Sequence, residues 1–312
     1  MKPLLARDWE RDKLVFPLGV QPKIDGVRGL TTEGGLTGRS LKKHKNVYTT
    51  ALYSAPEYAG LDGELAAAEE TDPELCRKTS SAVSTITGKP FTYFHIFDCL
   101  NKHVINYSYI DRYEYLADHL NSQHSRGLCP YAKIVPMEIV SDLDALLVWE
   151  HRWLQQGYEG LIIRNLHAMH KQGRSSVLKA ELLRIKRFIE EEAVVDSLVE
   201  GEANNNEAQI NELGRSFRTS HMDNKVPKGV VGNLQCTMLK DVIWNGKQIL
   251  SQGQQITVSP GNMNHEQRKH YWDNPKELIG QTIKFKFFPV GIKDKPRFPT
   301  YQSHRSGEDM SD

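Results

Sequence analysis

Apolar and polar positions change their spacing along the chain, and the spacing predicts where strands and helices lie. Short strands on either side of Gly34 and Gly35 predict a β-hairpin over residues 27–39. Residues 92–98 are aromatic and β-branched and predict a buried strand, and residues 160–164 predict another. Apolar residues at helical spacing predict helices around 113–120 and 143–154.

Local signals indicate where these helices begin and end. Asp72 followed by Pro73 predicts the start of a further helix, which fades by Gly88. Ser141 is suited to cap the helix over 143–154, and Gly157 is suited to end it. Residues 1–189 therefore mix strands and helices without the regular alternation of a doubly wound sheet, which predicts an α+β domain.

The pattern changes after the acidic residues 190–192. Five short strands are predicted, over residues 194–199, 232–239, 247–250, 255–258 and 282–288. This number of strands suits a small β-barrel of the OB type. We predict an N-terminal domain over residues 1–189 and an OB-fold domain over 190–312. Residues 201–231 form a polar, asparagine-rich insertion of the kind that is functional or disordered.

Composition fits a two-domain globular protein. The chain has 312 residues, of which 39% are hydrophobic and 25% charged, and no apolar run is long enough to cross a bilayer. We therefore expect no membrane partner. The first residues lack the apolar core of a secretory signal, which predicts a cytoplasmic location. The four cysteines are widely spaced, so neither a zinc knuckle nor a disulfide framework is expected.

Charge is balanced overall and uneven locally. The net charge is +1, yet residues 171–187 contain six basic residues against one acid, and residues 276–305 contain seven against two. Each cluster is consistent with a solvated face and with a polyanion partner.

The sharpest motif is K-x-D-G-x-R, formed by residues 23–28. By itself it is also compatible with a surface turn. Further motifs follow in order: Thr37-Gly38-Arg39-Ser40, the D-G-E of residues 62–64, Tyr93 to Asp98, Glu159 to Arg164, Gly173-Arg174-Ser175 and Leu183 to Phe188.

This ordered set resembles the covalent nucleotidyltransferase superfamily, which contains DNA ligases, RNA ligases and messenger-RNA capping enzymes. With residues 278–305, the whole chain is similar to compact ATP-dependent DNA ligases of bacteriophages and viruses. The resemblance implies an ATP-grasp-like nucleotidyltransferase domain of antiparallel sheets and helices, followed by an OB-fold β-barrel. It implies an enzyme that seals nicks between a 3′-hydroxyl and a 5′-phosphate in duplex DNA through a lysyl-AMP intermediate.

Lys23 is the predicted nucleophile to which AMP becomes attached. A lysine amine attacks phosphorus only when it is neutral, and the nearby cations Arg184 and Lys186 would favour that form while holding the ATP phosphates. The family's K-x-K motif has Arg184 in place of its first lysine. Arginine keeps the positive charge of lysine but has a planar guanidinium in place of the compact ammonium, so the sequence does not assign a role to Arg184.

The resemblance also implies a nucleotide pocket, a metal site and contacts to phosphates. Phe97 offers a flat face for adenine, although core packing of a strand explains it equally, and Ile163 or a neighbour would close the other side. The predicted nucleotide-binding residues are Gln21, Lys23, Arg28, Glu64, Phe97, Ile163 and Lys186. Magnesium or manganese would be held by Asp25 and Glu159, and Glu64 could bind either the metal or ribose.

Arginines are predicted to bind the remaining phosphates, since their forked guanidinium groups suit phosphate oxygens. Arg28, Arg39 and Arg174 are assigned to the 5′-phosphate of the nick, and Arg297 or Arg305 to orientation of pyrophosphate.

The predicted partner is nicked duplex DNA, bound by a monomer. Only 22 residues precede Lys23, too few for a helical DNA-binding domain, which leads us to expect a bacteriophage or viral source. An RNA ligase or capping enzyme would share the chemistry of Lys23. An OB-fold protein that only binds nucleic acid is the alternative from another class.

Overall fold

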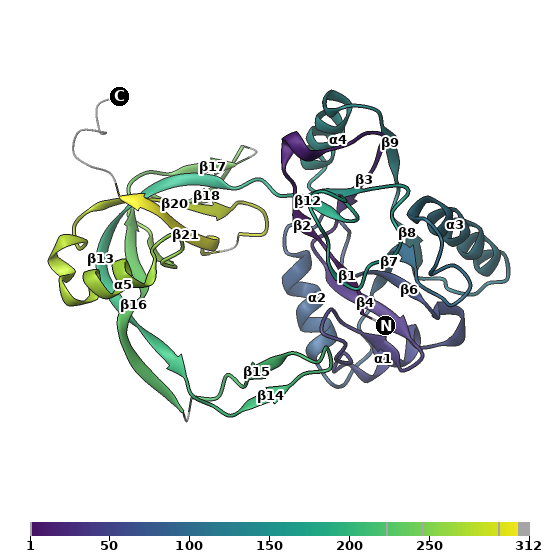
Figure 1. The fold of residues 1–312 in the computed structure, drawn as a ribbon, viewed down its shortest axis with the longest axis horizontal. Helices are drawn as coiled ribbons and strands as arrows, with labels where there is room; N and C mark the ends of the chain where they lie inside the picture. Colours follow the sequence, from purple (N-terminus) through teal and green to yellow (C-terminus); the bar gives the residue numbers. More distant parts are fainter. Residues whose placement is uncertain (1, 223, 245, 293, 305–312) are drawn as a thin grey trace. The chain divides into compact units, whose positions relative to one another are not determined.

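The computed structural model describes residues 2–222, 224–244, 246–292 and 294–304. The chain divides into two compact units, Met1–Lys186 and Arg187–Asp312 (Figure 1). The predicted domain limits at residues 189 and 190 stay a prediction, as does the insertion over 201–231. No helix in the described ranges is both long enough and apolar enough to cross a membrane.

The first unit contains two five-stranded sheets. The first of them has the order β5-β4-β6-β7-β8, and all its pairs are antiparallel except β7 with β8. Its strands are β4 (Val27–Thr32), β5 (Gly35–Thr37), β6 (Leu61–Ala66), β7 (Tyr93–Cys99) and β8 (Ala132–Ile134). The predicted hairpin and the predicted strand over 92–98 are confirmed here as β4, β5 and β7.

The second sheet has the order β2-β12-β10-β3-β9. Its strands are β2 (Arg7–Asp8), β3 (Leu18–Lys23), β9 (Glu138–Val140), β10 (Gly160–Arg164) and β12 (Leu183–Ile185). A separate parallel pair joins β1 (Leu4–Leu5) to β11 (Gly173–Arg174). The predicted strand over 160–164 is confirmed as β10.

Helices α1 (Val47–Tyr53), α2 (Leu75–Ser84), α3 (Tyr109–Ser125) and α4 (Leu143–Gln155) belong to the same unit. The predicted N-termini of two helices, α4 and α2, were wrong by a residue or more. The side chain of Asp142, and not of Ser141, accepts the Ala145 N–H at the start of α4. Helix α2 begins at Leu75 because Asp72 accepts the Glu74 N–H in a turn before the helix.

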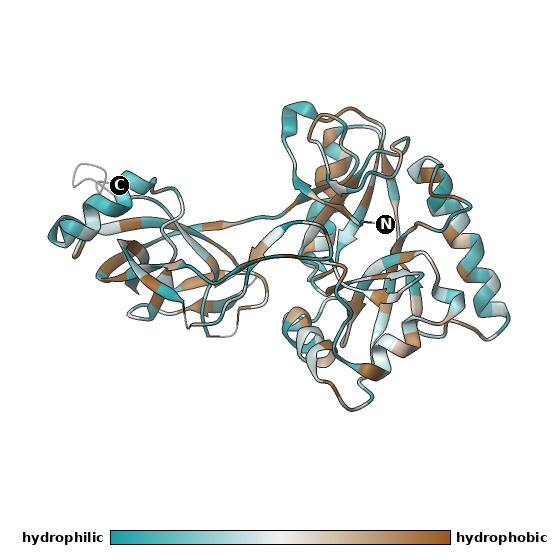
Figure 2. Cartoon of the chain, turned by 60° about the horizontal axis from the view of Figure 1, so that its bottom comes forward, coloured by the Kyte–Doolittle hydropathy of each residue, from teal (hydrophilic) through white to brown (hydrophobic). Residues whose placement is uncertain are grey.

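Each sheet of the first unit contributes its own buried cluster. Leu61, Leu65, Phe94 and Ile96 pack beneath the first sheet, and Val20, Leu161, Ile163 and Ile185 pack within the second. In Figure 2, apolar residues gather in the strands, whereas much of the helical surface is hydrophilic. The alternation of inward and outward residues therefore leaves one face of β3, β10 and β12 for polar side chains.

The second unit is built on a five-stranded sheet of order β19-β16-β13-β20-β21. Its strands are β13 (Ile189–Asn204), β16 (Lys225–Met238), β19 (Gln255–Val258), β20 (Thr282–Phe288) and β21 (Arg297–His304). Edge strands β19 and β21 meet through a bridge between Ser259 and Thr300, with hydrogen bonds of 2.9 and 3.0 Å. This bridge closes the sheet into a barrel around a core that includes Val258, Phe285 and Phe287.

Three strand positions predicted in this unit are confirmed as β18 (Lys247–Leu250), β19 and β20. Strand β13 contains the predicted strand over 194–199, and β16 covers the one predicted over 232–239 except its last residue; both observed strands are longer. Pattern reasoning missed β21, β17 (Val242–Trp244) and helix α5 (His265–Asp273). Helix α5 starts with a capping box in which Asn264 and Gln267 exchange hydrogen bonds. The helix has no buried residue, so it lacks the apolar stripe that would have indicated it.

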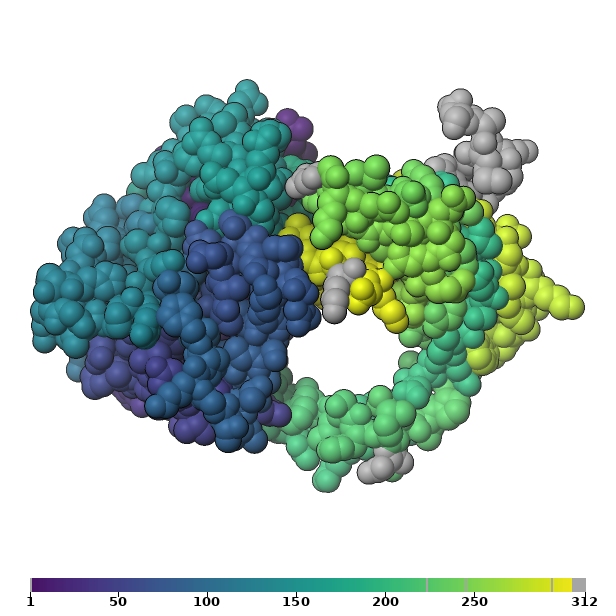
Figure 3. Space-filling view, turned by 180° about the vertical axis from the view of Figure 1, so that it is seen from behind, coloured from purple at the N-terminus to yellow at the C-terminus, as the bar shows by residue number. Residues whose placement is uncertain are grey.

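A narrow arm extends from the barrel. The outer ends of β13 and β16 pair as far as Asn204 with Lys225, and the hairpin of β14 (Ala208–Ile210) and β15 (Ser216–Arg218) lies between them. Figure 3 shows this green segment projecting from the rest of the unit. Ile210 is 72% exposed, so the arm carries apolar surface with no covering element of its own unit.

Breaking a buried ion pair should destabilise the first unit strongly. Arg112 and Asp98 are each 1% exposed and share two hydrogen bonds of 2.8 and 3.0 Å. We predict that Arg112→Met lowers the free energy of unfolding by about 3–5 kcal/mol, because the carboxylate of Asp98 loses its bidentate partner. Urea denaturation followed by circular dichroism measures the change. Arg77→Met removes an exposed arginine from Glu74 and is the control that should leave the midpoint unchanged.

Candidate active site

Lys23 is the last residue of β3, at the point where the chain leaves the second sheet and enters β4 of the first. Gly26 makes this crossing possible, since a Cβ atom there would lie 2.2 Å from the carbonyl oxygen of Leu65. The motif over residues 23–28 therefore joins the two sheets. Its glycine is required by close approach to the neighbouring strand β6.

The carboxylate of Glu159 lies between two amines. Glu159 is 1% exposed, and its two oxygens form ion pairs with Nζ of Lys23 and Nζ of Lys186. The backbone fixes this meeting, because the Glu159 N–H donates to the Lys23 carbonyl at 3.0 Å and Gly160 pairs with Lys23. Residues 136 positions apart in sequence thus form one charged cluster.

Glu64 approaches this cluster from the first sheet. Burial raises the pKa of its carboxyl to about 7, against the opposing attraction of Lys23 and Arg28, while Glu159 and Asp25 raise it further. Burial also lowers the pKa of Lys186, as does repulsion from Lys23, although Glu159 acts in the other direction. The site thus contains groups whose charge responds to a polyanionic ligand.

Arg28 is fixed in place by an acid of the next strand. Its Nε and Nη2 atoms donate to the two oxygens of Asp62 at 2.6 Å each, and Nη2 also contacts the Leu4 carbonyl at 3.3 Å. Burial opposes its charge, but Asp62, with Glu64 and Asp98, outweighs burial and raises the pKa of Arg28. The guanidinium therefore stays charged and faces the ring of Phe97, 4.7 Å from its centroid.

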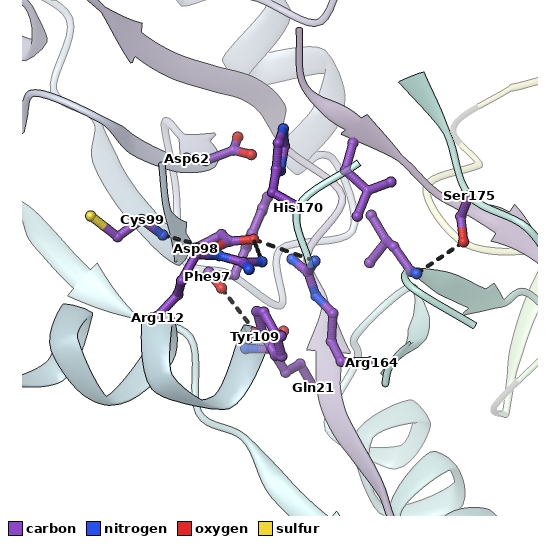
Figure 4. Close-up of polar contacts among 12 residues, drawn as sticks. Gln21, Asp62, Phe97, Asp98, Cys99, Tyr109, Arg112, Arg164, His170 and Ser175 are labelled. Carbon is purple, nitrogen blue, oxygen red and sulfur yellow. Dashed lines mark hydrogen bonds and ion pairs between the residues drawn. The ribbon is translucent and has the colours of Figure 1, made fainter. Parts of the chain in front are cut away.

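Phe97 is partly buried, and two arginines, Arg28 and Arg164, lie near its ring. Arg164 lies 5.4 Å from the ring centroid and 4.3 Å from that of Tyr109. Figure 4 shows Asp98 beside Arg112 and Arg164, with Tyr109 next to Gln21. The hydroxyl of Tyr109 donates to Gln21 Oε1 at 3.0 Å. Gln21 and Phe97 are thereby held by one buried polar network.

Ile163 does not lie on the face that carries Lys23. It is fully buried in the apolar core with Val20 and Leu183, its partners across the sheet. Ile162 is partly exposed and pairs with Gln21 and Arg184, so it shares their face. The neighbour Ile162, and not Ile163, lies on the strand face that carries Gln21 and Arg184.

The other arginines predicted as site residues in the first unit are partly or fully exposed. Arg184 donates to Asp8 at 2.7 Å, and this hydrogen bond lowers the pKa of Asp8. Arg39 is exposed just after β5. Arg174 is exposed on β11, with one weak contact to the Ala6 carbonyl at 3.4 Å. Arg184 shares its strand face with Lys186, two residues further on.

The two arginines predicted to orient pyrophosphate are not in this unit. Arg297 begins β21, donates to the Val290 carbonyl at 3.0 Å and lies 5.4 Å from the ring centroid of Phe288. Arg305 lies outside the described residues.

The donor set at Lys23 suits a divalent cation that is shared with substrate phosphates. In the ranges described, no group of three or more histidine, cysteine or acidic residues has the geometry of a metal centre. Magnesium commonly takes only one or two protein carboxylates together with phosphate oxygens. The carboxylates of Glu159, Asp25 and Glu64 are close enough for their charges to interact, so their oxygens are the donors that such a cation would take.

Several residues of the site escaped pattern reasoning. Asp62, Asp98 and Arg164 are end residues of motifs that the sequence analysis named, so the sequence could have indicated that they belong to the site. Tyr109 and Arg112 gave none, because they lie on α3 and reach the site only through tertiary packing.

Comparison with known proteins now identifies the class. A family model described as "ATP dependent DNA ligase domain" matches residues 16–186, and one described as "DNA ligase OB-like domain" matches residues 224–305. Together they define a nucleotidyltransferase domain followed by an OB-fold domain. The chain belongs to the family of ATP-dependent DNA ligases, and it is an enzyme of that family.

Solved structures show the same architecture over nearly the whole chain. The Chlorella virus DNA ligase-adenylate is 25% identical, with 98% of this chain and 99% of that chain covered and a TM-score of 0.53. A Lig E DNA ligase is 21% identical, with coverages of 98% and 99% and a TM-score of 0.71. The bacteriophage T7 ligase in complex with ATP is 15% identical, with coverages of 97% and 98% and a TM-score of 0.50. No curated protein sequence matches the chain.

The raised pKa of Glu64 makes a prediction about stability. Its pKa in the folded protein, about 7, exceeds the ordinary value of 4.5, so the folded state binds more protons between these values. Stability contributed by Glu64 is therefore lost as pH rises from about 4.5 to about 7. We predict that Glu64→Gln has a higher melting temperature than the wild type at pH 8, and that this gain shrinks toward pH 5.

Differential scanning fluorimetry across this pH range measures the difference between the two proteins. Glu33→Gln, which alters an exposed carboxylate, serves as the control and should show no such slope. A gain for Glu64→Gln that is constant with pH, or that grows toward acid, would contradict the prediction.

Proposed function

We propose that Lys23 is the residue that carries AMP between ATP and DNA. Nζ of Lys23 attacks the α-phosphorus of ATP, forming a P–N bond while pyrophosphate leaves. A DNA 5′-phosphate oxygen then attacks the same phosphorus, which frees Lys23 and leaves AMP on the DNA end. The 3′-hydroxyl of a nicked duplex finally attacks the 5′-phosphate, releasing AMP and closing the strand. The ion-paired cluster of Lys23, Glu159 and Lys186 supports this assignment most directly.

The surroundings of Lys23 supply position and charge. Lys186, with its lowered pKa, is placed to bind phosphate oxygens when the triphosphate displaces it from Glu159. Phe97 and Ile162 would lie on either side of an adenine ring, and Gln21, which accepts a hydrogen bond from Tyr109, would face its edge. Fixed charges and planes of this kind reduce the reorganisation needed in the transition state.

Asp25 and Glu159, with Glu64 as a possible third donor, would hold magnesium or manganese. The ion, when bound, neutralises charge on the ATP phosphates. The chain's own part is to place these carboxylates around the amine of Lys23 and to keep that amine directed into the pocket.

Arginines at the surface are the proposed contacts for nicked duplex DNA. Arg39 and Arg174 are exposed and can reach a 5′-phosphate, whereas Arg28 is already held by Asp62 and acts as a fixed charge in the pocket. The arm over residues 201–231 adds further basic residues suited to backbone phosphates. Arg297 and Arg305 stay the proposed partners of pyrophosphate. We propose action as a monomer in the cytoplasm, and the bacteriophage or viral source stays a prediction.

Replacing Lys23 tests the assignment. We predict that Lys23→Ala forms no covalent adduct with α-labelled ATP and does not seal phosphorylated nicks. The same variant should still seal a nick that already carries 5′-adenylate, because the last step needs no lysine nucleophile. The Lys13→Ala variant, which changes an exposed lysine, should behave as the wild type.

Mass spectrometry of the ATP-treated wild type should place AMP on the peptide that contains Lys23. An adduct on another side chain, or labelling by GTP and not by ATP, would overturn the proposal; GTP labelling would favour a capping enzyme. Sealing of nicked RNA in preference to nicked DNA would favour an RNA ligase.

A further inference from the structure

A second hydrogen-bonded group lies directly beside Glu159. The hydroxyl of Tyr158 donates to Oε1 of Glu70, and the other oxygen of Glu70 lies 3.1 Å from Nδ1 of His95. Tyr158 is 8% exposed and His95 is 2% exposed, so both ends of this chain of contacts are buried, while Glu70 between them is partly exposed. None of the three residues belongs to the pocket described above.

These contacts connect the two sheets that carry the halves of the active site. His95 lies on β7 and pairs across the first sheet with Glu64 on β6, so the two side chains share a face. Tyr158 precedes Glu159 at the entry to β10 in the second sheet. Glu70 lies in the loop that follows β6. One chain of hydrogen bonds therefore joins the strand next to Glu64 to the residue next to Glu159.

The side chain of Tyr158 adds a contact to the backbone hydrogen bond that joins Glu159 to Lys23. Gly157 and Gly160 flank the Tyr158–Glu159 pair, with φ angles of +98° and +158°. At Gly160 a Cβ atom would meet the Ile185 carbonyl oxygen at 2.2 Å, and at Gly157 it would lie 3.2 Å from the Thr71 carbonyl oxygen. Glycines on both sides leave the dipeptide more freedom than other residues would. The side chain of Tyr158 is the element that ties it to the loop.

The direction of the hydrogen bonds does not change near neutral pH. The hydrogen bond with His95 lowers the pKa of Glu70 to about 2, against the effect of burial, and the hydrogen bond from Tyr158 lowers it further. Burial and the neighbouring Glu70 raise the pKa of Tyr158 above its ordinary value. Glu70 is thus the ionised acceptor and Tyr158 the donor throughout the range in which a ligase would be assayed.

We propose that Tyr158, Glu70 and His95 form a brace that positions Glu159, and through Glu159 the amine of Lys23, for attack on ATP. The brace rests on the proposed role of Lys23 and adds positioning residues to it. The hydroxyl of Tyr158 donates to Glu70 and would act through Glu159, so its loss slows lysyl-adenylate formation without weakening ATP binding. Small displacements of reacting groups have large kinetic costs, up to about 10²-fold for 1 Å.

The test measures single-turnover formation of the lysyl-AMP adduct by Tyr158→Phe in a rapid-quench instrument. We expect the maximal rate of adduct formation to fall about 10-fold. The ATP concentration that gives half of the maximal rate should be unchanged. Tyr53→Phe is the matched control, since it removes a buried hydroxyl that donates to the Thr92 carbonyl at 2.5 Å in the core of the same unit. This control should keep the wild-type rate.

Variants of Glu70 separate positioning from general stability. Glu70→Gln keeps an oxygen that accepts from Tyr158 and should retain most of the rate, whereas Glu70→Ala should match Tyr158→Phe. The double variant Tyr158→Phe/Glu70→Ala should be no slower than either single variant, because both changes break the same chain. Glu70 is about one-third exposed, so the protein should tolerate its replacement.

Three results would overturn the brace: a wild-type adenylation rate in Tyr158→Phe, additive losses in the double variant, or a rate loss matched by Tyr53→Phe. The proposed function fails separately, when wild-type protein forms no adduct at Lys23. If one of these results excludes the brace while Lys23→Ala still abolishes the adduct, the proposed role of Lys23 is unaffected.

Discussion

The active site depends on a buried carboxylate shared by two amines. Glu159 is 1% exposed, and a carboxylate in such a place is tolerated only when it is paired. Lys23 and Lys186 provide the pairing, and the register of β10 against β3 brings them to it. Under the proposed function, a triphosphate would compete with Glu159 for both amines. The stability of the free protein and the proposed binding of ATP would then depend on the same three charges.

The site is assembled from two sheets that must keep a fixed distance. Lys23, Glu159 and Lys186 belong to the second sheet or its ends, whereas Arg28, Glu64 and Phe97 belong to the first. One covalent link between them is the short crossing through Gly26, which packs against β6, and another is the segment between β8 and β9. Polar networks behind the pocket supply the other links. These are the Asp98 cluster beneath Phe97 and the proposed brace from His95 to Tyr158.

In the second unit, two strands of a small barrel continue beyond its hydrophobic core. Its apolar cluster fills the closed sheet, and β13 and β16 continue beyond it as a paired ribbon. Main-chain pairing joins β14 to β15 at the end of this ribbon, where Ile210 is largely exposed. An exposed segment of this kind has little stability of its own, which is consistent with the proposed contact between the arm and DNA.

The sequence alone determined the class of both domains, most strand positions and the residues with charge at Lys23, because motifs and two-residue or 3.6-residue periods are local properties. It could not place α5, which buries no residue, nor choose between Ile162 and Ile163, since a strand's two faces are distinguished only by what packs on them. Tyr109, Arg112 and Tyr158 had no motif at all. Their contacts join segments 14 to 88 residues apart, and only the packing of the sheets and α3 decided that these side chains meet the site.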